Sequence, residues 1–539
     1  MMNYPLTLPH LLERARLIHG SAEIVSRMPD KSLHRYTYDD FVRRAKSLAK
    51  ALIQAGLRKG DRVGTLMWNH YVHLEAYFGI PVSGGVLHTL NLRLHPDEIA
   101  YIAGHAEDRF LIVDDVLLPL LKRFEDKLRV EKIIVVPLTG QPVPEPYTDY
   151  EAFIAGAGSP DDFEYPDLDE QDALGMCYTS GTTGRPKGVV YSHRSMILHS
   201  FACAMTDTMG LSIKDSAMPV VPMFHVNAWG LPFTLTMVGS KQVYPGPHLD
   251  PVSLLELMQH EQVTFAAGVP TIWFGILQEL EKNPGHWKLQ DGLRTAVGGS
   301  AAPESMLRGM DRHGVRVIHA WGMTETAPVG TVGILKPHLL KRSEDEQYAW
   351  RAKQGIPVPF VEIRVVGENG EAPWDGKSMG ELEVRGPWVA AAYHNLPDGS
   401  DSFTEDGWFR TGDVATIDEE GYMKITDRTK DLIKSGGEWI SSVDLENAIM
   451  AHPAVKEAAV VGISHPKWQE RPLAVVVKKE GADLTLEGLH AFLAPKFAKW
   501  WLPDEMVFVD EIPRTSAGKF LKSRLREEYK DLYSGGSAS

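Results

Sequence analysis

A short stretch rich in glycines and hydroxyl side chains, residues 178–188, has the groups needed to hold a phosphate. It reads Tyr-Thr-Ser-Gly-Thr-Thr-Gly-Arg-Pro-Lys-Gly. Glycines let backbone N–H groups approach an anion closely, hydroxyls donate further hydrogen bonds, and Lys187 supplies a positive charge. The pattern therefore predicts a phosphate cradle, and ATP is the ligand that we expect there.

The segment before this cradle indicates where it lies in the fold. Residues 173–178 form an apolar run, which predicts a buried strand that ends where ligands of α/β sheets bind. The spacing of Gly181, Gly184 and Lys187 differs from the P-loop pattern Gly-x-x-x-x-Gly-Lys-Ser/Thr. A polar surface turn is the alternative interpretation of such a stretch. The regular continuation through Pro186 favours the cradle.

Further segments that combine glycines with polar or aromatic side chains follow along the chain. They read Met-Phe-His-Val-Asn-Ala-Trp at 223–229, Gly-Gly-Ser-Ala-Ala-Pro at 298–303, Trp-Gly-Met-Thr-Glu-Thr at 321–326, Gly-Glu-Leu at 380–382, Arg-Thr-Gly-Asp at 410–413, Asp-Arg-Thr-Lys-Asp at 427–431, Ser-Gly-Gly-Glu-Trp-Ile at 435–440 and Pro-Arg-Thr-Ser-Ala-Gly-Lys at 513–519.

In this order, the segments resemble the signatures of the adenylate-forming superfamily, which includes acyl-CoA synthetases, luciferases and the adenylation domains of peptide synthetases. Residues 435–440 and 513–519 are most similar to the fatty-acyl-CoA ligase branch and its bacterial relatives, the 3-methylmercaptopropionate CoA ligases. The resemblance covers nearly the whole chain.

The resemblance implies an ATP-dependent ligation of a carboxylic acid to coenzyme A. A carboxylate is a poor acylating agent because its leaving group would be an oxide. Attack on the α-phosphate of ATP converts that oxygen into a phosphate-bearing leaving group and releases pyrophosphate, and the thiol of coenzyme A then displaces AMP. The expected cofactors are ATP, Mg²⁺ and coenzyme A, and the expected partner is a small-molecule carboxylate.

The resemblance also assigns catalytic roles to residues at matching positions. Lys519 matches the adenylation lysine that contacts the carboxylate and the α-phosphate; a surface lysine in a basic tail is the alternative. Glu325 matches the carboxylate that holds Mg²⁺, and Thr324 is then expected to touch the α-phosphate.

The nucleoside part of ATP has its own expected contacts. Asp413 matches the acceptor of the ribose hydroxyls, and Arg428 matches their second contact. Trp321 matches an aromatic residue that packs on adenine, where tyrosine is more usual in the family; alone it would be interpreted as a core residue. The complete set expected to bind cofactors is Thr179, Ser180, Gly181, Thr182, Thr183, Lys187, Gly299, Ala301, Pro303, Ala320, Trp321, Gly322, Met323, Asp413, Arg428, Gly436 and Gly437.

For the acyl group, the resemblance nominates His225, Trp229, Gly268, Val269 and Trp439, each of which could instead be a core residue. No Cys, His or carboxylate lies near His225 at a spacing that would make it a metal ligand. The glycine pair before Trp439 would let a pantetheine arm pass close to the backbone. The two tryptophans match gate elements of fatty-acid relatives.

Helix-type and strand-type patterns alternate to about residue 330, as at Phe41, Ala45, Leu48 and Leu52 followed by the strand-like residues 62–67. After Gly376, short strands with glycine turns take over. Another compact unit follows Lys430, in which the pattern at residues 486–493 predicts a helix.

These patterns predict an α/β protein with two domains. Residues 1–429 are expected to form a large amino-terminal domain with layered α/β subdomains and a β-rich subdomain. Residues 430–539 are expected to form a small, mobile α+β domain that carries the catalytic lysine. In the resembled family Lys430 is a hinge; a solvated linker charge is the alternative.

Composition agrees with a large enzyme: 539 residues are 43% hydrophobic, and 56 basic against 71 acidic residues give a formal charge of −15. Such a charge disfavours nucleic acid as a partner. Two cysteines are too few for a disulfide framework, so we expect a cytoplasmic protein. We expect no signal peptide and no transmembrane segment. Related fatty-acid ligases suggest a homodimer.

The identity of the acid stays open. The Trp-Gly-Met variant at 321–323 is most similar to the 3-methylmercaptopropionate branch, which favours a short- or medium-chain acid; a long-chain fatty acid is the alternative. Two other functions are a carrier-protein-loading adenylation domain and a non-catalytic nucleotide-binding protein.

Overall fold

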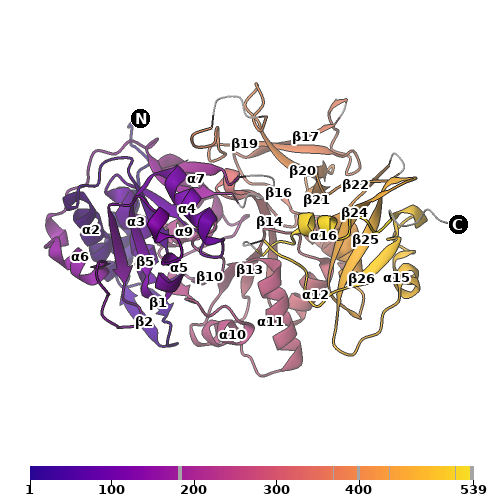
Figure 1. Ribbon diagram of the computed structural model, residues 1–539, viewed down its shortest axis with the longest axis horizontal. Coiled ribbons are helices and arrows are strands. Elements are labelled where there is room, and N and C mark those ends of the chain that lie inside the picture. The colour runs from indigo at the N-terminus through magenta and orange to yellow at the C-terminus, as the bar shows by residue number, and fades with distance from the viewer. Residues whose placement is uncertain (180–184, 368, 397–400, 436–437, 516–517, 534–539) are drawn as a thin grey trace.

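The computed structural model describes residues 1–179, 185–367, 369–396, 401–435, 438–515 and 518–533. Within these residues the strands form four sheets, and helices pack around three of them (Figure 1). The chain begins at the left of the view and ends at the right, so the first and last sheets lie at opposite ends of the molecule. This mixed α/β architecture confirms the predicted fold class.

The seven-stranded sheet carries the amino-terminal core. Its strands, in spatial order, are β7 (Thr148–Asp149), β6 (Lys132–Val136), β5 (Asp108–Asp114), β3 (Arg62–Leu66), β4 (Val86–Thr89), β8 (Ala173–Tyr178) and β9 (Gly188–Ser192). All neighbouring pairs are parallel except β8 with β9. The predicted strand at 173–178 is therefore confirmed.

Among the helices of this part, α2 (Tyr38–Gln54) begins at a capping box. The side chain of Thr37 caps α2 by accepting from Asp40 N, while the Asp40 carboxylate accepts from Thr37 N. The predicted apolar stripe of α2 is fully buried. The other helices of this part are α1 (Leu8–His19), α3 (Tyr71–Val82), α4 (Pro96–Ala106), α5 (Leu118–Leu121), α6 (Tyr150–Gly156) and α7 (His193–Ala204).

A nine-stranded sheet forms the middle of the molecule. Its order is β16 (Ile356–Pro357), β15 (Val329–Val332), β14 (Arg316–Gly322), β13 (Arg294–Val297), β12 (Phe265–Gly268), β10 (Ser216–Pro219), β11 (Lys241–Tyr244), β1 (Glu23–Arg27) and β2 (Leu33–Thr37). Its helices are α8 (Val226–Trp229), α9 (Leu231–Val238), α10 (Pro251–His260), α11 (Pro270–Lys282), α12 (Glu304–Arg312) and α13 (Glu344–Arg351). The neighbours β12, β13 and β14 are parallel, so their carboxyl ends meet at one edge.

A five-stranded antiparallel sheet follows. It contains β18 (Gly370–Glu371), β17 (Glu362–Gly367), β19 (Gly380–Arg385), β20 (Phe409–Ile417) and β21 (Met423–Arg428) in that spatial order. This is the predicted change to short strands. Asp413 on β20 lies opposite Arg428 on β21, so register alone brings these two residues together.

The last sheet contains β22 (Ile433–Ser435), β23 (Glu438–Ile440), β24 (Val455–His465), β25 (Gln469–Lys478) and β26 (Glu505–Phe508), with helices α14 (Ser442–Met450), α15 (Leu486–Leu493) and α16 (Lys522–Glu528). It has its own hydrophobic clusters. The predicted helix at 486–493 is confirmed.

Among the described residues, the helices are all too short or too polar to traverse a lipid bilayer. The apolar segment from Tyr77 to Leu90 is core, since it forms the second half of α3 and all of β4. Both cysteines are buried free thiols.

Candidate active site

Two adjoining cavities lie where the nine-stranded sheet, the five-stranded antiparallel sheet and the carboxyl-terminal unit meet. Their volumes are about 470 and 260 Å³, and they share a wall made of Gly299, Ala320, Trp321, Gly322, Arg428 and Lys519. The shared residues come from motifs far apart in the sequence. Most of the predicted site residues that the structure describes line one of these cavities.

Two hydrogen bonds join the two ends of the predicted phosphate cradle. Thr179, directly after β8, donates its N–H to Lys187 O at 2.9 Å, and Lys187 N donates to Thr179 Oγ1 at 3.1 Å. Both residues line the larger cavity. Ser180, Gly181, Thr182 and Thr183 lie outside the described residues.

The predicted metal carboxylate is fixed by groups from other segments. Tyr393 donates its hydroxyl to Glu325 Oε1 at 2.7 Å, and Ala390 N donates to Glu325 O at 2.7 Å. The ammonium of Lys187 lies 4.6 Å from the centre of the Tyr393 ring. Burial, reinforced by the Glu325 carboxylate, raises the pKa of Tyr393, so the hydroxyl stays the donor. Neighbouring Thr324 is held by Tyr191, whose hydroxyl donates to Thr324 O at 2.8 Å.

These residues fit a Mg²⁺ ion supplied with a nucleotide. Mg²⁺ is usually bound by one or two carboxylates together with phosphates and water. Glu325 offers one carboxylate at the cavity wall. In the part of the chain that the structure describes, no cluster of three or more His, Cys, Asp or Glu side chains could hold a metal ion unaided.

Asp413 is anchored through both its backbone and its side chain. Its N–H donates to Thr411 Oγ1 at 3.0 Å, and the Thr411 hydroxyl donates to Leu382 O at 2.7 Å. The two carboxylate oxygens contact Arg428 Nε at 2.7 Å and Trp321 Nε1 at 2.9 Å. A nearly buried carboxylate thus faces the cavity in a fixed orientation.

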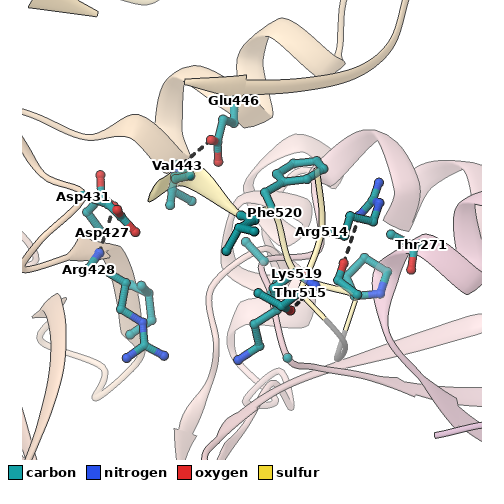
Figure 2. Close-up of a pocket in the computed structure, with 18 of the residues that line it drawn as sticks. Thr271, Asp427, Arg428, Asp431, Val443, Glu446, Arg514, Thr515, Lys519 and Phe520 are labelled. Atoms are coloured by element: carbon teal, nitrogen blue, oxygen red, sulfur yellow. Dashed lines mark hydrogen bonds and ion pairs between the residues drawn. The ribbon is translucent and has the colours of Figure 1, made fainter. Parts of the chain in front are cut away.

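Lys519 reaches the cavities from the carboxyl-terminal unit. Gly518 has a φ of 84°, and Thr515 N donates to Lys519 O at 2.7 Å. Figure 2 shows the charged ends of Lys519 and Arg428 pointing into the same space. Burial, followed by repulsion from Arg428, lowers the pKa of Lys519 to about 8, while Asp413 and Glu325 act in the opposite direction.

The predicted acyl residues His225 and Trp229 both line the larger cavity. Burial is the main cause that lowers the pKa of His225 to about 4, with the charges of Lys519 and Arg93 adding to it, so its ring is neutral near pH 7. Residues 226–229 form one left-handed turn, with φ between 47° and 59°. This conformation is costly for residues other than glycine and turns the Trp229 indole toward Gly298.

Other predicted positions lie beside the cavities rather than in their walls. Gly268 accepts a hydrogen bond from Trp273 Nε1 at 3.1 Å, and Val269 packs close to Gly299. Pro303 precedes α12, whereas Ala301 lines the smaller cavity and Met323 the larger one. Gly268, Val269 and Pro303 therefore line neither cavity.

The structure does not bring Trp439 to the site. Its side chain lies on β23, is 37% exposed, lines neither cavity and has the Lys434 ammonium 4.5 Å from its ring. Gly436 and Gly437 lie outside the described residues. Lys430, by contrast, lines the smaller cavity, and burial lowers its pKa.

A buried ion pair lies inside the carboxyl-terminal unit and lines the same cavity as Lys430. Lys522 Nζ lies 2.7 Å from Glu446 Oε1 and donates to Ser442 Oγ at 2.6 Å. Asp427 accepts from both Ser442 N and Ser442 Oγ, at 2.7 and 2.6 Å. Arg526 pairs with Asp431 at 2.5 Å. Figure 2 shows Glu446, Asp427 and Asp431 around one wall of the cavity.

Several lining residues could not be predicted from the sequence: Phe274, Gln354, Tyr393, Ile425 and Arg514. Gln354 Oε1 accepts from Ile425 N at 2.6 Å, which holds these two together. Of these residues, only Arg514 lies inside one of the motifs quoted above. The motifs could therefore have indicated Arg514 and none of the others.

Comparison with known proteins places these features in a family. A family model described as AMP-binding enzyme matches residues 14–394, and one described as AMP-binding enzyme C-terminal domain matches residues 444–519. A long-chain-fatty-acid–CoA ligase of Thermus thermophilus is 52% identical over 99% of this chain and 98% of its own. A 3-methylmercaptopropionyl-CoA ligase of Ruegeria lacuscaerulensis is 46% identical over 99% of both chains.

Solved structures give the same result. An anthranilate CoA ligase, AuaEII, in complex with anthranoyl-AMP has a TM-score of 0.87 at 25% identity, covering 99% of each chain. ATP-bound MatB from Rhodopseudomonas palustris has a TM-score of 0.82 at 27% identity, covering 98% of this chain and 100% of its own. The similarity thus extends over both the large and the small units.

Proposed function

Because the chain belongs to the AMP-binding enzyme family and is an AMP-forming acyl-CoA ligase, we propose that it activates a short- or medium-chain acid such as 3-methylmercaptopropionate. The single observation that carries the site assignment is the meeting of Lys519 with the Asp413–Arg428 pair and Glu325 around joined cavities. Cationic side chains and carboxylates around the same cavities suit the binding of a nucleotide and a carboxylate substrate.

In the first half-reaction the carboxylate approaches the α-phosphate of ATP, and like charges repel. Lys519 offsets this repulsion: an ammonium about 4 Å from a unit negative charge contributes roughly 4 kcal/mol at an effective dielectric constant of about 20, before desolvation. Lys187 and Thr179 hold the phosphates, and Thr324 touches the α-phosphate.

The nucleoside is held by residues of the wall that the cavities share and by neighbouring residues of the smaller cavity. Asp413 accepts the ribose hydroxyls, Arg428 makes the second contact, and the Trp321 ring packs on adenine beside Gly299 and Ala301. Glu325 would hold Mg²⁺, which neutralises phosphate charge when bound. Asp413 suits its role because its carboxylate is already oriented.

For the second half-reaction we assign residues 1–429 to a large domain and 430–539 to a small domain that turns about Lys430. The exposed position of Trp439, away from both cavities, supports this assignment. After rotation, β23 with Trp439 would face the acyl-AMP and guide the pantetheine arm of coenzyme A.

The names of the relatives indicate two candidate acids. Relatives named 3-methylmercaptopropionyl-CoA ligase, at 46% and 45% identity, favour a short thioether acid. A long-chain fatty acid is the second candidate, because the relative at 52% identity is named a long-chain-fatty-acid–CoA ligase. His225 and Trp229 would contact either acid, with Gly268 and Val269 behind them.

We further propose a cytoplasmic homodimer that binds small molecules and not nucleic acid. ATP and coenzyme A are cytoplasmic metabolites, and two buried free thiols suit a reducing compartment. Transfer to a carrier protein, or nucleotide binding without catalysis, are the other functions to be tested.

The decisive experiment measures AMP release with ATP, Mg²⁺ and coenzyme A for 3-methylmercaptopropionate, butyrate, octanoate and palmitate, compared by kcat/KM. A maximum at the thioether acid, at butyrate or at octanoate supports the proposal, and a maximum at palmitate selects the second candidate. Transfer of the acyl group from acyl-AMP to a carrier protein instead of coenzyme A, or no AMP release from any acid, would contradict it.

A further inference from the structure

The indole of Trp321 contacts the carboxylate that is expected to bind ribose. Trp321, near the end of β14, donates its Nε1–H to Asp413 Oδ2 at 2.9 Å, and Arg428 Nε lies 2.7 Å from Oδ1. Rotation of an aspartate carboxylate about its last side-chain bond is normally soft. Here donors from two strands hold one oxygen each, so the carboxylate plane is fixed.

The position of the Trp321 indole is fixed by packing against a glycine. It lies against Gly330 on β15, the antiparallel neighbour of β14, and a Cβ atom at Gly330 would lie 2.4 Å from the indole Cζ3. Trp321 is only 7% exposed and lines both cavities. The missing side chain at Gly330 therefore makes room for a ring that is large enough to reach Asp413.

We propose that Trp321 is a positioning residue for ribose recognition, whose indole N–H holds the Asp413 carboxylate so that its remaining lone pairs accept both ribose hydroxyls. Each carboxylate oxygen can accept two hydrogen bonds, and one on each oxygen is already used. This role goes beyond packing on adenine. It rests on the proposed function in that the ligand is an adenine ribonucleotide.

A purely apolar role for Trp321 makes a different prediction. Loss of ring packing lowers the affinity for every adenine nucleotide by the same factor, whatever its sugar. Loss of carboxylate orientation lowers the affinity for the nucleotide that carries both hydroxyls. It has less effect on the affinity for a nucleotide that lacks one of them. The ratio of affinities for AMP and its deoxy analogues separates the two roles.

The test is Trp321→Phe, with AMP, 2′-deoxy-AMP and 3′-deoxy-AMP binding measured by calorimetry. In the wild type we expect AMP to bind at least about tenfold more tightly than either analogue, as a hydrogen bond to a charged group allows. In the variant we expect this preference to fall by about tenfold. If all three affinities weaken equally and the preference is unchanged, the proposal is overturned.

Two controls complete the test. Trp388→Phe removes another buried indole donor, which bonds to Val329 O at 2.9 Å, and should leave the preference unchanged. If Trp321→Phe does not fold, β-(3-benzothienyl)alanine at position 321 keeps the ring shape and removes only the N–H. It should also lose the preference, and a retained preference would overturn the proposal.

Binding of AMP needs no acid and no coenzyme A, so this readout is independent of ligation. If no acid is ligated but the preference depends on Trp321 as stated, the proposed function fails and this inference stands. If ligation proceeds and the preference does not depend on Trp321, the inference alone fails.

Discussion

Tyr393 joins two charged groups of the active site: it donates its hydroxyl to Glu325 Oε1 at 2.7 Å and presents its ring to the ammonium of Lys187, 4.6 Å from the ring centre. The loop that carries Tyr393 is also tied to Glu325 through its backbone, because Ala390 N donates to Glu325 O. One side chain therefore orients both the proposed metal carboxylate and the cradle lysine.

Tyr393→Phe should weaken Mg²⁺ activation more than turnover. The ring and its contact with Lys187 remain, but Glu325 loses the donor that fixes its carboxylate. Removal of a group that orients a metal ligand typically lowers metal affinity by 10- to 100-fold. We expect about a tenfold rise in the Mg²⁺ concentration for half-maximal pyrophosphate release, with a smaller loss of kcat at saturating Mg²⁺.

Tyr348→Phe is the matched control, because Tyr348 donates a similar hydrogen bond to Asp311 at 2.7 Å away from the cavities. It should leave the Mg²⁺ dependence unchanged. Equal Mg²⁺ requirements of wild type and Tyr393→Phe would show that Glu325 does not depend on this hydroxyl.

Lys522→Met should destabilise the protein, and more so at higher pH. The change leaves the buried carboxylate of Glu446 without its cation, and breaking such a pair typically costs about 3–5 kcal/mol. Burial already raises the pKa of Glu446 to about 7 in spite of Lys522. A carboxyl whose folded-state pKa lies above its unfolded value binds more protons when folded, so stability falls as pH rises from about 4.5 through the folded pKa.

The measurement is the midpoint of thermal unfolding at pH 6 and pH 8. We expect a larger drop for Lys522→Met at pH 8 and partial recovery in the double variant with Glu446→Gln. Lys530→Met removes an exposed pair with Glu527 and should change the midpoint little. If the midpoint of Lys522→Met lies below that of the wild type by the same amount at both pH values, an ionised Glu446 is not the cause.

Sequence alone was sufficient for elements with a strong local pattern. The strand at 173–178 and the helix at 486–493 occur as predicted, because an apolar run and a helical stripe do not depend on distant contacts. The motif residues Trp321, Asp413 and Lys519 also meet at one site. For Asp413 and Arg428 the reason is strand register, which an alternating pattern can only suggest.

Other features depend on tertiary contacts that no local pattern encodes. The hydrogen bond between Trp321 and Asp413 joins residues on different sheets. The left-handed turn at 226–229 contains no glycine from which it could have been predicted. Tyr393 reaches Glu325 from a loop outside every motif. The distance of Trp439 from the cavities depends on how the carboxyl-terminal unit is oriented, which sequence spacing does not determine.

Lys430→Pro should separate the two half-reactions. Proline fixes φ near −65° and removes a backbone N–H, so the segment can no longer turn freely. We expect pyrophosphate release in the first turnover to stay within about threefold of wild type, while thioester formation from preformed acyl-AMP falls by about 100-fold or more, since a hinge absorbs the backbone change of a domain motion.

Lys430→Ala is the control, since it removes the charge and keeps the backbone free; it should retain both half-reactions. Equal loss of both half-reactions in Lys430→Pro would indicate a folding defect. Normal thioester formation in that variant would exclude a rotation about this residue.

The pH dependence of adenylation should report the Lys519 ammonium. Burial and the neighbouring Arg428 lower its pKa to about 8, so in the free enzyme the charged form is lost as pH rises through that value. We expect kcat/KM for ATP in the adenylation half-reaction to be level below pH 8 and to fall about tenfold per pH unit well above it. Bound phosphates favour the ammonium, so the fall in kcat should occur at higher pH.

Lys519→Gln tests whether this ionisation belongs to Lys519. The variant keeps a polar side chain but has no charge, and loss of a preorganised charge costs about 10²- to 10³-fold in rate. Its residual activity should lack the alkaline fall, while conversion of preformed acyl-AMP to acyl-CoA should be unaffected because that step uses another face of the small domain. A variant that adenylates at the wild-type rate would remove Lys519 from the mechanism, and an alkaline fall that persists would assign the ionisation to another group.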